Sequence, residues 1–197
     1  MASIGLSKIY WKVPDNSDCG VIGKAIHAEL TLDNTEPETL RADDVDAESL
    51  TVFSGATLTL QVDELTIPTA KSILGLWAAP STSGKIVFAA DAQAPRLTLA
   101  MLVKKMIGGS IKWRCICFPR VQFQIPDYSI DTQGETVNFQ TPELTAKVYK
   151  DDNGEWQEWC DFDTLLGATG FIVERTSIVV EEEGGDEYIP VETAGGG

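Results

Sequence analysis

Alternation of apolar and polar residues at every second position most constrains the fold of this chain. Between residues 26 and 33 the even positions are apolar and the odd ones polar, and 56–63 repeats the pattern. A third stretch alternates over 97–103, and Gly108 and Gly109 then supply a turn. Because successive residues of a strand point to opposite faces of a sheet, this period predicts half-buried β-strands.

The later strands carry two predicted irregularities. Residues 111–117 alternate, and the pattern resumes over 121–125 after Pro119, which has no amide hydrogen and therefore predicts a bulge or an edge position. The phase changes again at Thr141–Pro142, which predicts a second bulge. The predicted fold class is mainly β, an antiparallel β-sandwich or open barrel.

One segment, residues 68–76, breaks the β pattern. Residues 68–76 carry helix-forming side chains, with Thr66 as a cap and Pro68 in the first turn, so we expect one short α-helix there.

We assign residues 1–180 to a single β-domain. The acidic, glycine-rich residues 181–197 are expected to form a flexible C-terminal tail, and 34–49 an acidic loop.

The charge balance bears on possible partners. The chain has 197 residues and a formal net charge of −15, which disfavours ordinary nucleic-acid binding by Lys and Arg. Its longest apolar run, residues 73–79, is too short to cross a bilayer, and its start lacks a signal-peptide pattern. We therefore expect no membrane anchor, and a protein that is made in a cytoplasm and stays soluble or assembles there.

The residue types needed for catalysis are scarce. His27 is the single histidine and lies on the polar face of a predicted strand, with no nucleophile motif beside it. Cys115 and Cys117 lack the spacing of a structural zinc site and are expected, with the other cysteines, to be free thiols. No phosphate-binding glycine motif occurs. We expect a protein that is not an enzyme and holds no cofactor.

Carboxylates are abundant around one predicted loop. The candidate residues are Asp43, Asp44, Asp46 and Glu48. Clustered carboxylates are the residue type that binds calcium or forms the acid and base pair of glycoside hydrolysis, but the central glycine and terminal bidentate glutamate of a calcium loop are absent. We favour a loop that is either solvated or lies between subunits or rings. A similar acidic stretch, 151–154, is interpreted as a hairpin turn.

The five tryptophans suggest either sugar stacking or packing. They are Trp11, Trp77, Trp113, Trp156 and Trp159. They are scattered and mostly lie on apolar faces or beside turns, which favours packing in the core or at subunit interfaces.

The order of these features resembles the major tail (tail tube) proteins of long-tailed siphophages and related prophages. The segments that carry the resemblance are 4–10, 24–26, 40–44, 55–60, 113–126 and 134–142. Each motif alone is weak, and their order and spacing together are more specific. The similarity covers roughly residues 1–150.

The resemblance implies a tail-tube fold and a structural role in the virion. Such subunits form hexameric rings that stack into a hollow tube, assembled in the host cytoplasm, through which the genome passes without specific binding. It also implies contacts with the tape measure, tail terminator and distal tail proteins. Two alternatives stay open: a carbohydrate-binding or adhesion β-module, and the tube protein of a contractile injection system.

Overall fold

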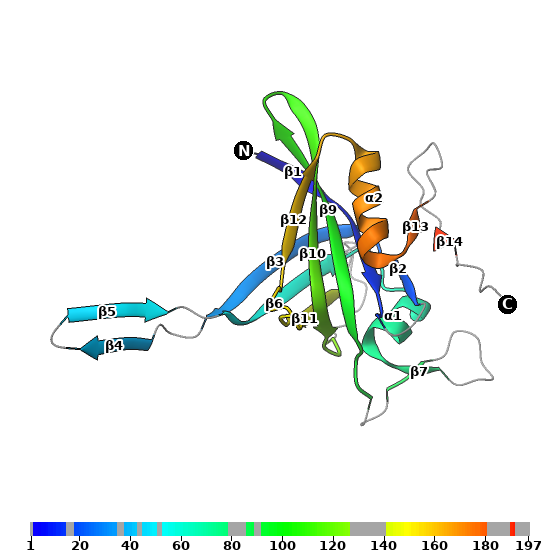
Figure 1. Ribbon diagram of the computed structural model, residues 1–197. Coiled ribbons are helices and arrows are strands. Elements are labelled where there is room, and N and C mark those ends of the chain that lie inside the picture. Colours follow the sequence, from blue (N-terminus) through cyan, green and yellow to red (C-terminus); the bar gives the residue numbers. More distant parts are fainter. Residues whose placement is uncertain are drawn as a thin grey trace, which may run out of the picture.

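The computed structural model describes residues 2–14, 18–34, 38–42, 45–50, 53–78, 86–88, 92–126, 141–180 and 190–191. An antiparallel sheet of eight strands dominates it, in the order β2-β1-β9-β10-β11-β6-β3, with β12 also paired to β10 (Figure 1). These strands are β1 (Ala2–Lys12), β2 (Cys19–Val21), β3 (Ala25–Asn34), β6 (Phe53–Val62), β9 (Arg96–Ile107), β10 (Ser110–Phe123), β11 (Glu143–Val148) and β12 (Glu158–Phe162).

Strand β10 organises the sheet because it is long enough to serve two partners on one side. Its first half pairs with β12, from Trp113 opposite Phe162 to Cys117 opposite Glu158. Its last residues pair with β11, where Val121 faces Val148. The predicted turn at 151–154 forms, with the Gly154 amide donating to the Asp151 carbonyl at 3.2 Å. The strands on either side of it lie end to end along β10 and do not pair with each other, so the predicted hairpin is wrong.

A first hydrophobic core lies where the sheet bends back on itself and brings β3 against β1. Leu58, Leu60, Leu97, Leu99 and Phe118 are fully buried there. No hydrogen-bonded pairing joins β1 to β3 among the described residues, so the sheet stays open. The prediction of a mainly β, antiparallel fold is confirmed, and its form is an open sheet rather than a closed barrel.

Helix α1 (Ile67–Leu74) covers one end of this core and matches the predicted helix. Thr66 is its N-cap and Pro68 lies in its first turn, while Ile73 and Leu74 are buried. The helix ends at Gly75, whose left-handed φ of 64° lets its amide donate to the Lys71 carbonyl. A Cβ at Gly75 would collide with the backbone of Gln93.

A second helix, α2 (Leu165–Thr176), was not predicted. It lies on the opposite face of the sheet, over β9 and β10 (Figure 1). Thr164 caps it by accepting a hydrogen bond from the Gly167 amide at 3.1 Å. Its buried Ala168 and Ile172 form a second hydrophobic core with Tyr10, Ala100, Leu102, Cys115, Cys117 and Ile178. Because the first core lies on one face of the sheet and α2 covers the other, the centre of the sheet is buried on both sides.

The irregularity predicted at Pro119 explains how β10 serves both cores. Phe118 faces Leu99 and Val121 faces Leu97, so β10 holds one extra residue between these pairs. An extra residue reverses which face the following side chains occupy. Cys117 therefore packs against α2, whereas Val121 lies in the first core. The bulge prediction is confirmed here, and the residues just before the second predicted bulge, 127–140, lie outside the described ones.

Three short antiparallel pairs complete the structure. They are β4 (Glu38–Ala42) with β5 (Val45–Leu50), β7 (Trp77–Ala78) with β8 (Ile86–Val87), and β13 (Val179–Val180) with β14 (Pro190–Val191). Figure 1 shows β4 and β5 beyond the ends of β3 and β6, away from the main sheet. Of the predicted tail, 181–197, the structure describes only β14. No described helix is long and apolar enough to cross a membrane.

Candidate assembly surfaces

The sequence-predicted acidic residues fall on the β4–β5 pair. Arg41 faces Asp46 and Leu40 faces Glu48 along the two backbones. Asp43 and Asp44, between the strands, lie outside the described residues, as do the side chains of β4 and β5. The prediction of a loop over 34–49 is therefore corrected in part, since residues 38–42 and 45–50 form paired strands. The role of these four carboxylates stays a prediction.

A second surface, which the sequence did not single out, is formed by β9, β10 and β12 on the face opposite α2. Arg114 is at its centre and donates two hydrogen bonds of 2.6 Å from Nε and Nη2 to the Asp161 carboxylate. This pair lowers the pKa of Asp161, chiefly through the Arg114 hydrogen bond, and nearby Lys105 and Lys112 add to the effect. Lys112 itself contacts Asp163 at 2.6 Å. The field on this surface is therefore positive enough to stabilise carboxylates.

Trp159 gives this surface an aromatic component. Its side chain is 57% exposed, although large aromatic residues usually bury most of their area. The Arg114 guanidinium lies 4.8 Å from the centre of the indole ring, which is within cation–π range. We call Lys105, Lys112, Arg114, Trp159, Asp161 and Asp163 the Arg114–Trp159 surface. The sequence pattern did not predict this surface, because it gave no sign that β12 lies beside β10.

Apolar side chains are also exposed beside the β9–β10 turn and the start of α2. Met106 and Ile111 face each other across this hairpin and are both 46% exposed. Leu165 and Leu166 open α2, and Leu166 is 68% exposed. Exposed apolar residues that gather at one end of a molecule are typical of contact surfaces, and this end includes the free outer edge of β12.

The tryptophan prediction divides among several environments. Trp11 is buried in the first core, where its indole Nε1 is the one buried side-chain polar atom without a partner among the described residues. Trp156 stacks on Phe53 with ring centres 4.4 Å apart. Trp113 packs against the second core, and Trp77's side chain lies outside the described residues. Packing is therefore confirmed for three tryptophans, and Trp159 is the exposed exception.

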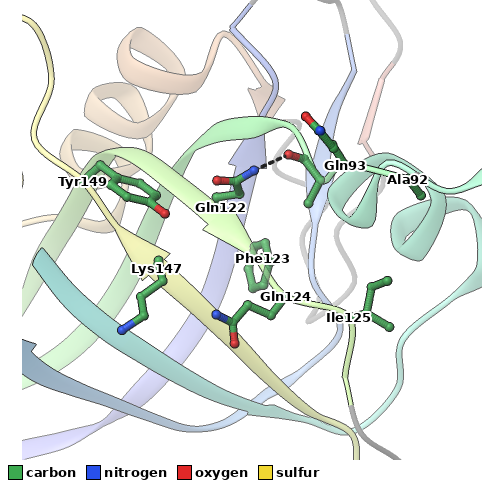
Figure 2. A pocket seen from close by; sticks show the side chains of 9 residues that line it. Ala92, Gln93, Gln122, Phe123, Gln124, Ile125, Lys147 and Tyr149 are labelled. Atoms are coloured by element: carbon green, nitrogen blue, oxygen red, sulfur yellow. Dashed lines mark hydrogen bonds between the residues drawn. The ribbon is translucent and has the colours of Figure 1, made fainter. Parts of the chain in front are cut away.

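A surface hollow of about 410 Å³ lies on the other end of the sheet, beside the last residues of β10 (Figure 2). Two of its polar side chains, Gln122 and Lys147, are engaged with neighbours. Gln122 donates to the Ala94 carbonyl at 2.8 Å, and the Lys147 ammonium contacts Asp33 at 2.9 Å and Thr57 at 2.7 Å. Arg96 lies over the Tyr149 ring. No free charged group points into the hollow from its described lining, so it does not indicate a ligand.

The residues considered above for catalysis or metal binding, His27 and Asp151, have roles in the local structure or lie at the surface. His27 is exposed, 3.9 Å from Glu29, on the polar face that the alternation predicts. Asp151 accepts hydrogen bonds from the Asn153 and Glu155 amides and so stabilises a turn. No group of three potential metal ligands occurs among the described residues.

The cysteines are free thiols, as predicted. Burial raises the pKa of Cys115 to about 12 and that of Cys117 to about 11. A thiol with so high a pKa is almost entirely protonated at neutral pH and is a poor nucleophile. These two residues therefore belong to the second core.

Searches against protein-family models and against curated proteins give no match to this chain.

Proposed function

We propose that this protein is a structural virion protein, the tail tube protein of a long-tailed bacteriophage. It would polymerise as stacked hexameric rings into the conduit for genome ejection. The order of sequence motifs over residues 1–150 supports this, together with a mainly antiparallel β fold.

The observation that carries the proposal is the set of contact surfaces that one copy leaves unused. The β4–β5 pair projects from one extremity and the β9–β10 turn lies at another (Figure 1). Exposed Met106 and Ile111 lie beside this turn, and the Arg114–Trp159 surface extends from there along β9, β10 and β12. These surfaces differ chemically, so they suit head-to-tail contacts, which continue into tubes, better than a self-complementary dimer. The outer edges of β3 and β12, unpaired among the described residues, would add backbone hydrogen bonds between subunits.

The charge of the chain fits a DNA conduit. A protein with net charge −15 repels a polyanion on average, so duplex DNA would pass along the tube without being held. In this proposal the protein is located in the virion tail after assembly in the host cytoplasm. Its other partners would be the tape measure, tail terminator and distal tail proteins. The same features suit the tube of a contractile injection system, where a sheath would surround it.

One observation favours a second candidate, the carbohydrate-binding or adhesion module. Trp159 is exposed beside a guanidinium and a carboxylate, and sugars stack on exposed indoles and bond to such groups. A single exposed tryptophan is a small platform, and most of the other tryptophans pack against neighbours. This function therefore has the weaker support.

Negative-stain microscopy with light scattering over a concentration series tests the proposal. We expect rings of six subunits, or hollow tubes, as the concentration rises. A species that stays monomeric at every concentration, including after addition of preformed tail tips as initiators, would refute it. Binding of that monomer to a glycan array, lost in Trp159→Ala and kept in Trp156→Phe, would establish the adhesion module.

A further inference from the structure

Charge is strongly segregated along this acidic chain. The β9–β10 hairpin, Arg96–Phe123, contains six Lys and Arg residues and no Asp or Glu, in a protein of net charge −15. Residues 38–50, which span the β4–β5 pair, contain five Asp and Glu residues and a single basic residue, Arg41. Opposite charges concentrated on two separate hairpins are an arrangement that favours their association between molecules.

The basic hairpin presents part of its charge on an ordered surface. On the face opposite α2, Lys105 lies across from Lys112, and the next pair brings Val103 opposite Arg114. Strand β12 extends this face with Asp161 and Trp159, which face Arg114 and Ile116. Three cations therefore surround two carboxylates, Asp161 and Asp163, and the balance on this surface is positive.

The internal ion pairs leave capacity for further carboxylates. Lys105 has no ion pair among the described residues. A guanidinium has five N–H donors, and Arg114 uses only Nε and Nη2 on Asp161. The exposed indole of Trp159 adds apolar area that an extended strand can cover. The surface is thus suited to an acidic β-strand.

The acidic hairpin cannot reach this surface in the arrangement that a single copy adopts. Figure 1 shows β4 and β5 beyond the far ends of β3 and β6, and the β9–β10 turn at a separate extremity of the sheet. A contact between the two therefore requires a second copy.

We propose that the Arg114–Trp159 surface is the docking site for the acidic β4–β5 hairpin, residues 38–50, of a second copy of this chain. This inference rests on the proposed tube function and names the surface that receives the projecting hairpin. Carboxylates of the incoming hairpin add to Asp161 and Asp163 around Lys105, Lys112 and Arg114, and its backbone covers Trp159. Because donor and acceptor surfaces lie on different parts of one copy, each contact leaves another pair free, so stacking continues.

Charge reversal on each partner tests the docking. The basic-surface variant is Lys105→Glu with Lys112→Glu, and the acidic variant is Asp44→Lys with Asp46→Lys. Each alone is expected to raise the concentration needed for tube growth by at least about ten-fold at low salt. A mixture of the two variants is expected to assemble again, because each then supplies the surface that the other lacks. Circular dichroism of each monomer checks that it folds.

The outcomes separate this inference from the proposed function. If the unchanged protein forms tubes and both variants do so equally well, the docking site is wrong and the tube function stands. If the unchanged protein forms no tubes even after preformed tail tips are added, the function itself fails. Rescue in the four-residue variant but not in the mixture would place the contact within one copy. Reversal of Glu181–Glu183 to Lys is the matched control, and if that variant alone is defective and is rescued by the basic-surface variant, the occupant is the C-terminal segment.

Discussion

Replacing Ile172 with alanine tests whether α2 is part of the folded core of this protein. Ile172 is 0% exposed and packs with Cys115, Cys117, Ala100 and Leu102, so the change leaves a cavity between the helix and the sheet. Truncating a buried isoleucine costs about 2–5 kcal/mol, and the better helix propensity of alanine returns about 0.4 kcal/mol. We expect a net loss of about 2–4 kcal/mol in the free energy of unfolding.

The assay is urea denaturation of the monomer, followed by tryptophan fluorescence and circular dichroism, with a thermal melt alongside. For a domain of this size the expected loss corresponds to a fall in Tm of about 4–16 °C. Leu166→Ala is the matched control on the same helix, because its side chain is 68% exposed, and it should change stability by less than about 0.5 kcal/mol. If Ile172→Ala costs no more than Leu166→Ala, the packing of α2 against the sheet is wrong.

Three further predictions concern other parts of the molecule. Gly75→Ala should destabilise the protein by at least about 1 kcal/mol more than Gly109→Ala in denaturant titrations; both residues have positive φ, but only at Gly75 does a Cβ meet backbone, and equal losses would contradict this geometry. Cys115 and Cys117, with pKa values of about 12 and about 11, should resist a thiol reagent at pH 8 while the half-buried Cys19 and Cys160 react. Early labelling of all four thiols would exclude this burial. Because burial raises the pKa values of Cys115 and Cys117 from 9.0, the stability that these two thiols contribute is complete below about pH 9 and is lost as the pH rises toward 12. Arg114→Gln should raise the pKa of Asp161 toward its ordinary value of 3.8, as measured by carboxyl NMR titration, whereas Arg120→Gln should leave it unchanged.

The sequence alone determined the elements whose signal is local. Alternation predicted the inward-facing residues of β6 and β9, because a strand that is buried on one face must repeat with a period of two. Thr66, Pro68 and the following helix formers predicted α1, and Pro119 predicted the bulge in β10, because each acts through its own backbone geometry. The free state of the cysteines was predicted in part from spacing, because Cys115 and Cys117 lack the spacing of a structural zinc site.

Only the tertiary structure decided which faces were covered. Helix α2 has weak sequence signals, with Gly167 and Gly170 inside it, and forms because Ala168 and Ile172 pack on the sheet. The alternation of β9 therefore hid the fact that Ala100 and Leu102 are buried too. The Arg114–Trp159 surface depends on β12 lying beside the first half of β10, a pairing between residues 113–117 and 158–162 that no local pattern specifies. Local residues fix strands and turns, whereas contacts between distant segments decide partners, since those depend on the packing of the whole chain.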